Sequence, residues 1–187
     1  MRVVGFRVRS GVTLCVLVEG AKESWQVLAS CEVPLSPQGG KFARFPFHPT
    51  VELEGRAAIV ESRKAVAAVR MTARREMRAA LADLAPIEAA GVVGGSLTDP
   101  GRIHNPHVQA HAREAQLYRE VVTSELKQAG IAFEVLSDRD ILARLADLHR
   151  TSVAALNRSL TRAGRGTFRP WAAHQKLAAA GALWGLH

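Results

Sequence analysis

Three histidines in the middle of the chain have the spacing of metal ligands. His104, His107 and His111 form an H-x-x-H-x-x-x-H pattern, and Asp99 precedes them. His107 and His111 are four residues apart, so on a helix they share one face and can hold Zn²⁺. We favour the interpretation that these histidines begin a helix and contact phosphate or water. The alternative is a transition-metal site, or a catalytic site in which Asp99, His104 and His107 act as acids and bases.

A second group of residues combines positive charge with an aromatic ring near the C-terminus. A glycine-broken loop carries Arg165, Arg169 and Trp171, and Lys176 follows about one helical turn later. Cationic groups contact phosphates and an aromatic ring stacks on a base, so this segment is a candidate nucleic-acid contact. The other interpretation is that Trp171 anchors the last helix.

Residues 34–55 are rich in proline and glycine and are predicted to form an ordered loop. Lys41 and Arg44 alternate there with phenylalanines, a combination typical of nucleic-acid contacts. The interpretation we favour is that the phenylalanines fix the loop to the core.

The charge of the whole chain favours an anionic partner. The net charge is +8 and the isoelectric point is about 10.5, and nucleic acid is the commonest partner of such a basic protein. A stripe at Arg70, Arg74 and Arg78 is more typical of a solvated helix face. We therefore expect DNA or RNA as the partner and no cofactor, and we leave a homo-oligomer or a protein partner open.

The composition is that of a globular domain, 48% hydrophobic and 22% charged. No apolar run approaches the roughly 20 residues that a membrane span needs, and the N-terminus has no apolar secretory segment. Cys15 and Cys31 are expected to be core thiols in a reducing compartment. These features predict one cytoplasmic domain over residues 1–187, with 34–55 as a loop insertion and 149–187 as a helical extension.

Apolar patterning predicts three N-terminal strands at residues 2–9, 12–18 and 25–33, joined as an antiparallel meander. Val4, Phe6, Leu14 and Val16 are expected to be buried within them. A central strand at 89–93, closed by two glycines, is predicted to lie beside the first strand and parallel to it. The remaining elements are a strand at 131–136 and helices at 62–84, 106–129, 137 or 138 to 148, 151–163 and 171–186.

This order of elements resembles the ribonuclease H-like fold, an α/β fold with a five-stranded mixed sheet of order 3-2-1-4-5 and helices on both faces. Within that superfamily the chain resembles the RuvC-type resolvases and their YqgF-type relatives. The resemblance lies in VVGFRVRSGVTLCVLV at the first two strands, VVGGSL at the fourth strand, and LAAAGALWGL at the last helix. It implies a nuclease-like protein acting on nucleic acid.

The chain departs from this family at the positions that matter for catalysis. The resemblance implies two divalent metal ions held by carboxylates from strand one, strand four and the last helix. Arg7 stands at the first-strand aspartate position, and residues 1–18 and 148–187 contain no Asp or Glu. We therefore expect a ribonuclease H-like protein that binds nucleic acid without two-metal nuclease activity. The residues expected to contact the nucleic acid, through exposed side chains, are Arg7, Arg9, Arg165, Arg169, Trp171 and Lys176.

Two other functions remain open from the sequence. One is a divergent metal-dependent nuclease or resolvase that uses Asp99 and the histidines. The other is a protein-interaction subunit of a larger complex, in which the basic residues only keep the surface solvated.

Overall fold

An antiparallel meander forms the first half of the sheet in the computed structural model, which describes residues 1–22, 24–95, 97–165 and 168–187. Its strands are β1 (Arg2–Arg9), β2 (Val12–Ala21) and β3 (Ser24–Pro34). Gly11 makes the tight β1–β2 turn with a φ of 80°, a conformation in which glycine is favoured. The predicted burial of the meander is confirmed, since four side chains are at most 2% exposed: Val4, Phe6, Leu14 and Val16.

Two parallel strands complete the sheet. β4 (Ala89–Gly94) pairs in parallel with β1, and β5 (Ala132–Ser137) pairs in parallel with β4. The strand order is β3-β2-β1-β4-β5, as predicted. β1 and β4 therefore end at the same edge of the sheet, where Arg7 lies opposite Val93.

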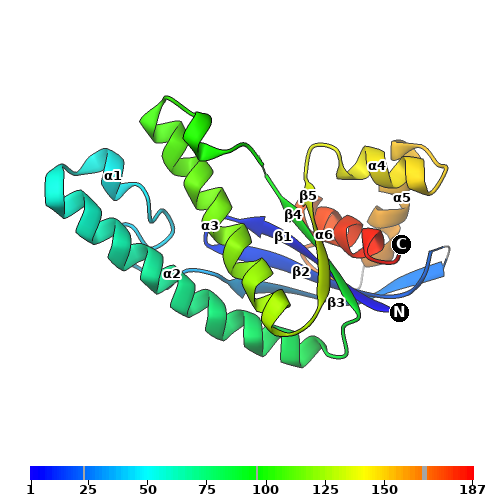
Figure 1. Cartoon of the computed structure of the whole chain (residues 1–187). Coiled ribbons are helices and arrows are strands. Elements are labelled where there is room, and N and C mark those ends of the chain that lie inside the picture. The colour runs from blue at the N-terminus through cyan, green and yellow to red at the C-terminus, as the bar shows by residue number, and fades with distance from the viewer. Residues whose placement is uncertain (23, 96, 166–167) are drawn as a thin grey trace.

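Helices cover both faces of this sheet (Figure 1). α2 (Gly55–Leu84) and α3 (Pro106–Gln128) pack on one face, around Phe6, Met77 and Tyr118. α6 (Ala173–Trp184) packs on the other face, together with two shorter helices, α4 (Ile141–Leu148) and α5 (Val153–Gly164). None of the helices in the described ranges is long and apolar enough to span a membrane.

α6 lies directly on the backbone of the sheet because two strand residues are glycines. A Cβ on Gly5 would collide with the carbonyl oxygen of Ala178, and a Cβ on Gly91 would collide with that of Gly181. This helix is built largely from alanine and glycine and is buried along most of its length. The segment that we expected as a C-terminal extension therefore supplies one of the two layers that sandwich the sheet.

Several boundaries differ from the predicted ones. α2 begins at Gly55 instead of residue 62. The prediction missed its first two turns because they lack the apolar periodicity that marks the rest of the helix. The predicted loop contains a short helix, α1 (Pro49–Glu52), and a 3₁₀ turn, η1 (Pro100–Arg102), precedes α3. The last helix starts at residue 173 instead of 171, since Ala172 is extended.

Two local expectations were wrong. α4 begins after Asp140, whose side chain makes no capping hydrogen bond, so neither Ser137 nor Asp138 caps it. Cys15 and Cys31 are direct cross-strand partners with free thiols, but only Cys15 is buried. β3 lies at the rim of the sheet, and Cys31 is exposed to solvent there.

Candidate nucleic-acid interface at the edge of the sheet

Arg7 is a buried, paired cation and not the exposed one that we expected. Its side chain is 11% exposed, and its Nη2 lies 2.6 Å from Oδ2 of Asp138. Nη1 donates a second hydrogen bond to the carbonyl oxygen of Val8 at 2.9 Å. Burial lowers the pKa of Arg7 and the charge of Asp138 opposes that shift, so the guanidinium stays protonated.

The backbone fixes Asp138 opposite β1. Asp138 follows the last residue of β5, and its N–H donates to the carbonyl oxygen of Gly94 at 2.9 Å. The ends of β1, β4 and β5 therefore meet at this pair. Asp138 was not among the residues singled out from the sequence, because only the parallel pairing of β4 with β5 brings it opposite Arg7.

Four arginines line a pocket of about 280 Å³ at this edge. We call it the arginine pocket and define it by Arg7, Arg9, Arg44 and Arg119, which come from β1, the segment before α1, and α3. The backbone of Gly94 forms part of its wall. In the described part of the chain no Asp or Glu lines the pocket.

Specific contacts hold two of these arginines in place. Arg44 Nε donates to the carbonyl oxygen of Ser10 at 2.8 Å, and the hydroxyl of Tyr118 donates to the carbonyl oxygen of Arg44 at 2.8 Å. The stem of Arg119 passes close to Gly94, where a Cβ would lie 2.6 Å from its Cδ. Gly94 thus leaves the room that Arg119 occupies.

The electrostatics of this edge favour an anion. Burial lowers the pKa of Arg119, as it does for Arg7. Burial, followed by the positive charges of Arg9 and Arg7, also lowers the pKa of His174 in the first turn of α6. Guanidinium groups present planar pairs of N–H donors that match the oxygens of phosphate or carboxylate, so the pocket can bind an oxyanion.

The predicted residues of the C-terminal segment lie outside the arginine pocket. Arg169 lines a separate pocket of about 400 Å³ beside β2 and β3, next to Phe168 and Cys31. Arg165 is exposed just after α5, and Lys176 is half-buried in the first turn of α6. The structure brings only Arg7 and Arg9 of the six predicted contacts into the arginine pocket.

Trp171 makes the contacts of an anchoring residue. Its Nε1 donates to the carbonyl oxygen of Leu160 at 2.8 Å, and its ring packs where a side chain on Gly164 would otherwise lie. Of the two interpretations that the sequence left open, this geometry supports the one in which Trp171 joins α5 to the start of α6.

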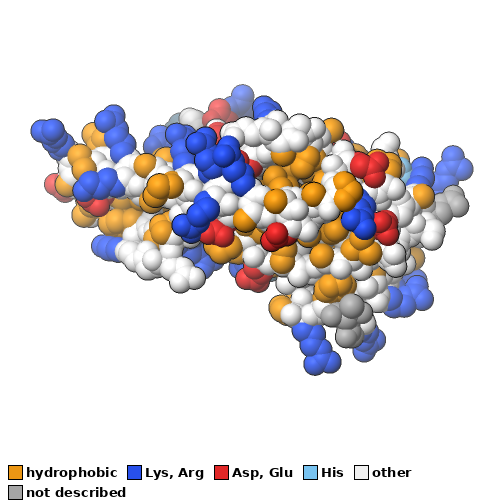
Figure 2. Space-filling view, turned by 90° about the horizontal axis from the view of Figure 1, so that it is seen from below, with side chains coloured by type: hydrophobic (Ala, Val, Ile, Leu, Met, Phe, Trp, Pro, Cys, Tyr) orange, Lys and Arg blue, Asp and Glu red, His pale blue; other side chains and the backbone are white. Residues whose placement is uncertain are grey.

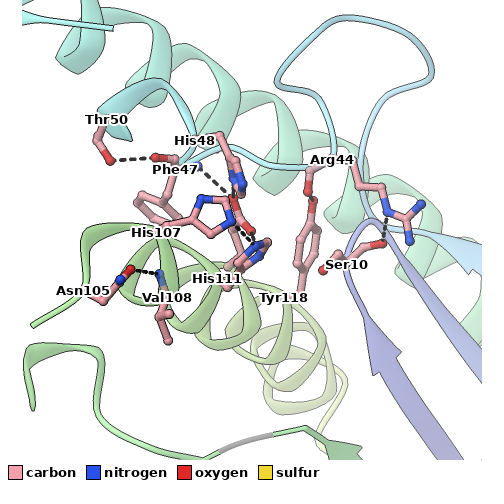
Figure 3. Close-up of polar contacts among 11 residues, drawn as sticks. Ser10, Arg44, Phe47, His48, Thr50, Asn105, His107, Val108, His111 and Tyr118 are labelled. Atoms are coloured by element: carbon pink, nitrogen blue, oxygen red, sulfur yellow. Dashed lines mark hydrogen bonds and ion pairs between the residues drawn. The ribbon is translucent and has the colours of Figure 1, made fainter. Parts of the chain in front are cut away.

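A histidine cluster forms, and it differs in one member from the alternative that the sequence offered. His48, His107 and His111 place ligand nitrogens within 4.8 Å of one another, and their rings point toward a common centre in Figure 3. His104 is exposed ahead of Asn105, the N-cap of α3, and is not part of the group. No local spacing relates His48 to residues 107 and 111, so the sequence offered no signal for it.

Asp99 has a local structural role. Its Oδ1 accepts the N–H of Gly101 at 2.9 Å and so begins η1, and its side chain is exposed. This places Asp99 on the loop between β4 and α3, where it caps a turn.

The strand order, the parallel pairing of β1, β4 and β5, and the helices on both faces define a ribonuclease H-like fold. Among solved structures, the chain is similar to RuvC of Thermus thermophilus, with a TM-score of 0.55 and 15% identity over 98% of this chain and 92% of that one. RuvC of T. thermophilus in complex with a Holliday junction substrate matches with a TM-score of 0.54, again at 15% identity, over 98% and 90%. No protein-family model and no curated protein sequence matches the chain. At this identity the comparison establishes the RuvC-like fold.

Proposed function

We propose that this protein binds nucleic acid by holding backbone phosphate in the arginine pocket, and that it does so without two-metal nuclease activity. The observation that carries the proposal is the set of four arginines around one pocket at the carboxyl ends of β1 and β4. Ligands of open α/β sheets bind at the carboxyl ends of the strands, so the pocket lies where a ligand is expected. RuvC, which has a similar fold, has been solved in complex with a Holliday junction substrate.

The groups at this edge do not fit a pair of Mg²⁺ ions. Mg²⁺ requires several oxygen ligands in near-octahedral geometry, usually including one or two carboxylates. The carboxylate of Asp138 is already paired with Arg7, whose guanidinium would repel a cation. α6 offers no acidic residue. This chemistry supports phosphate binding in place of phosphodiester cleavage.

The basic residues of α2 form a different kind of surface. Exposed cations along this helix are mixed with apolar and acidic side chains, as the view from below shows (Figure 2). Arg74 and Arg78 lie 3.6 and 2.9 Å from the carboxylate of Glu125, which is almost fully buried on α3. These two arginines therefore join α2 to α3, and we do not include them in the proposed interface.

Fluorescence anisotropy with labelled nucleic acids tests the binding. The panel consists of a four-way DNA junction, duplex DNA, single-stranded DNA and RNA. We expect the protein to bind at least one of these at low salt. Arg9→Ala and Arg119→Ala should each weaken that binding. Arg2→Ala is the matched control, because Arg2 begins the same strand as Arg9, about 23 Å away by strand rise. Unchanged affinity in the pocket variants would contradict the proposal, and no binding of any nucleic acid would favour the protein-interaction subunit.

A cleavage assay tests the absence of two-metal chemistry. The same substrates are incubated with Mg²⁺ or Mn²⁺, and we expect them to remain intact. Cleavage that disappears in Asp138→Asn would show that this edge is a nuclease site and would favour the divergent nuclease.

A further inference from the structure

We propose that His48, His107 and His111 bind one divalent transition-metal ion of the zinc class through their Nε2 atoms, with Glu114 orienting the rings from behind. This metal site is distinct from the arginine pocket and does not depend on the proposed function.

The α3 helix supplies three of the four groups from one face. His107, His111 and Glu114 are separated by four and three residues, so they follow one another along the same side of the helix. Pro106 and the capping hydrogen bond from the Val108 N–H to Asn105, at 3.0 Å, fix the first turn from which His107 projects.

The fourth group is held against α3 by the segment that precedes α1. His48 is only 12% exposed, and the N–H of the preceding Phe47 donates to Glu114 Oε1 at 3.3 Å. Ser62 on α2 donates to the carbonyl oxygen of Pro46 at 2.8 Å and fixes the same segment from its other side. The position of His48 is thus set by contacts with two helices.

Glu114 determines which nitrogens remain for a metal. Its Oε1 lies 2.8 Å from His48 Nδ1, and its Oε2 lies 3.3 Å from His111 Nδ1. With Nδ1 of His48 donating to Glu114, the Nε2 atom of that ring is left with a free electron pair. The longer contact to His111 places the same carboxylate behind the second ring. Metal-bound histidines have this arrangement, in which a carboxylate holds the far nitrogen of the ring.

The distance between two of the ring nitrogens suits a tetrahedral ion. His107 Nε2 and His111 Nε2 lie 3.2 Å apart. Two nitrogens that each lie about 2.0–2.1 Å from a tetrahedral zinc ion are roughly 3.3 Å apart. The ring centroid of His48 lies 5.2 Å from that of His107 and 4.8 Å from that of His111, and the ligand nitrogens of the three rings lie within 4.8 Å of one another. His48 would therefore move slightly toward the other two rings when an ion binds.

Glu114 is a buried acidic residue whose partners lie mainly in the histidine cluster. Its side chain is fully buried, and the partners that the structure shows for it in the described ranges are the two histidine rings and the Phe47 N–H. Glu114 Oε2 makes no hydrogen bond of good geometry. A buried carboxyl group is unfavourable unless it is paired or hydrogen-bonded, and a divalent ion on the two rings would place positive charge next to it.

The site is open on one side. His107 and His111 are exposed, so three protein ligands would leave the fourth position of a tetrahedral ion to solvent. Closed structural zinc sites have four protein ligands, whereas an exchangeable fourth position is typical of sites that bind a small ligand or activate water.

Zinc titration of the 187-residue chain tests this proposal. The chain is first treated with a chelator, and binding is followed by calorimetry and metal analysis. We expect one Zn²⁺ per chain, and visible absorption typical of tetrahedral Co²⁺ when cobalt replaces zinc. His48→Ala, His107→Ala and His111→Ala should each abolish this binding. Glu114→Gln should weaken it by about 10–100-fold, the usual effect of losing a carboxylate behind a metal-bound histidine.

Two histidines provide matched controls. His104→Ala removes the residue that the sequence pattern includes and the structure excludes. His149→Ala removes a ring whose Nε2 lies 3.1 Å from His187 Nε2, a histidine pair that no third described ligand completes. Both variants should bind zinc as the wild type does. Absence of zinc binding, or binding that survives His48→Ala, would overturn the site, and circular dichroism of each variant without metal shows whether it has folded.

Discussion

Arg7 and Asp138 depend on each other at the edge of the sheet. Removing one partner leaves the other charge in a site that is only partly open to water, with 11% and 23% of the two side chains exposed. We expect Asp138→Ala to lower the free energy of unfolding by about 2 kcal/mol, less than a fully buried pair would lose. Urea denaturation measures this change.

The comparison for this variant is Glu19→Ala. Glu19 pairs with Arg2 at 2.9 Å, but both side chains are more than a third exposed. Such a pair contributes less than about 1 kcal/mol. Equal losses in the free energy of unfolding for Asp138→Ala and Glu19→Ala would show that solvent screens the Arg7–Asp138 pair as it does the Arg2–Glu19 pair.

Cys31 is predicted to be a reactive thiol. A hydrogen bond from the buried thiol of Cys15 lowers the pKa of Cys31 to about 7. The thiolate is the reactive form, so the rate of alkylation by iodoacetamide should rise as the pH passes through about 7. Cys15→Ala removes the hydrogen bond and should move this rise to higher pH. Mass spectrometry of the labelled peptide measures the rate, and an unchanged profile in Cys15→Ala would show that the Cys15 thiol does not set the pKa of Cys31.

At the scale of whole elements, the contact of α6 with the sheet depends on glycine. Gly91→Ala places a Cβ against the backbone of Gly181, which cannot move without shifting the helix. We expect a loss of about 3 kcal/mol in the free energy of unfolding. Gly95→Ala is the matched control, because a Cβ there meets no atom within 4 Å. Similar midpoints for the two variants in thermal denaturation would show that α6 can withdraw from the sheet at little cost.

The elements that the sequence predicted well are those with a regular apolar pattern. The strands at 2–9 and 89–93 and the helix at 106–129 are confirmed within two residues, because burial on a sheet or helix face imposes that pattern. The start of α2 was missed because apolar residues that are exposed there, such as Ile59 and Val60, break the apolar pattern. α1 was missed because it is a single turn within a proline-rich segment.

The candidate sites were predicted less completely than the fold. Arg7, Arg9, His107 and His111 were found because each lies close in sequence to a recognisable strand or helix. Arg44, Arg119 and Asp138, and His48 in the cluster, join their sites only through tertiary packing. Contacts between segments as distant as β1 and β5 leave no spacing in the sequence from which they can be inferred.

At the scale of the whole molecule, the positive charge should make binding strongly dependent on salt. Each phosphate that a cation neutralises releases counterions, and the logarithm of the affinity falls linearly with the logarithm of the salt concentration. Arg9→Ala should reduce that slope by about one unit. Arg75→Ala removes the same charge from α2, where Arg75 pairs with Glu76, and should leave the slope unchanged. Equal salt slopes in the wild type, Arg9→Ala and Arg75→Ala would mean that the positive charge attracts nucleic acid without a defined contact between Arg9 and a phosphate.

The segment before α1 carries a residue of each proposed site, since Arg44 lies in the arginine pocket and His48 in the histidine cluster. Both residues are close in sequence and both are tied to α3, through Tyr118 and Glu114. An ion bound to His48 therefore acts on the same segment that presents Arg44 to the arginine pocket. The two ligands should be thermodynamically linked: zinc should raise the affinity for nucleic acid, and nucleic acid should raise the affinity for zinc by the same factor. In Arg44→Ala, zinc should still bind, but it should no longer raise the affinity for nucleic acid.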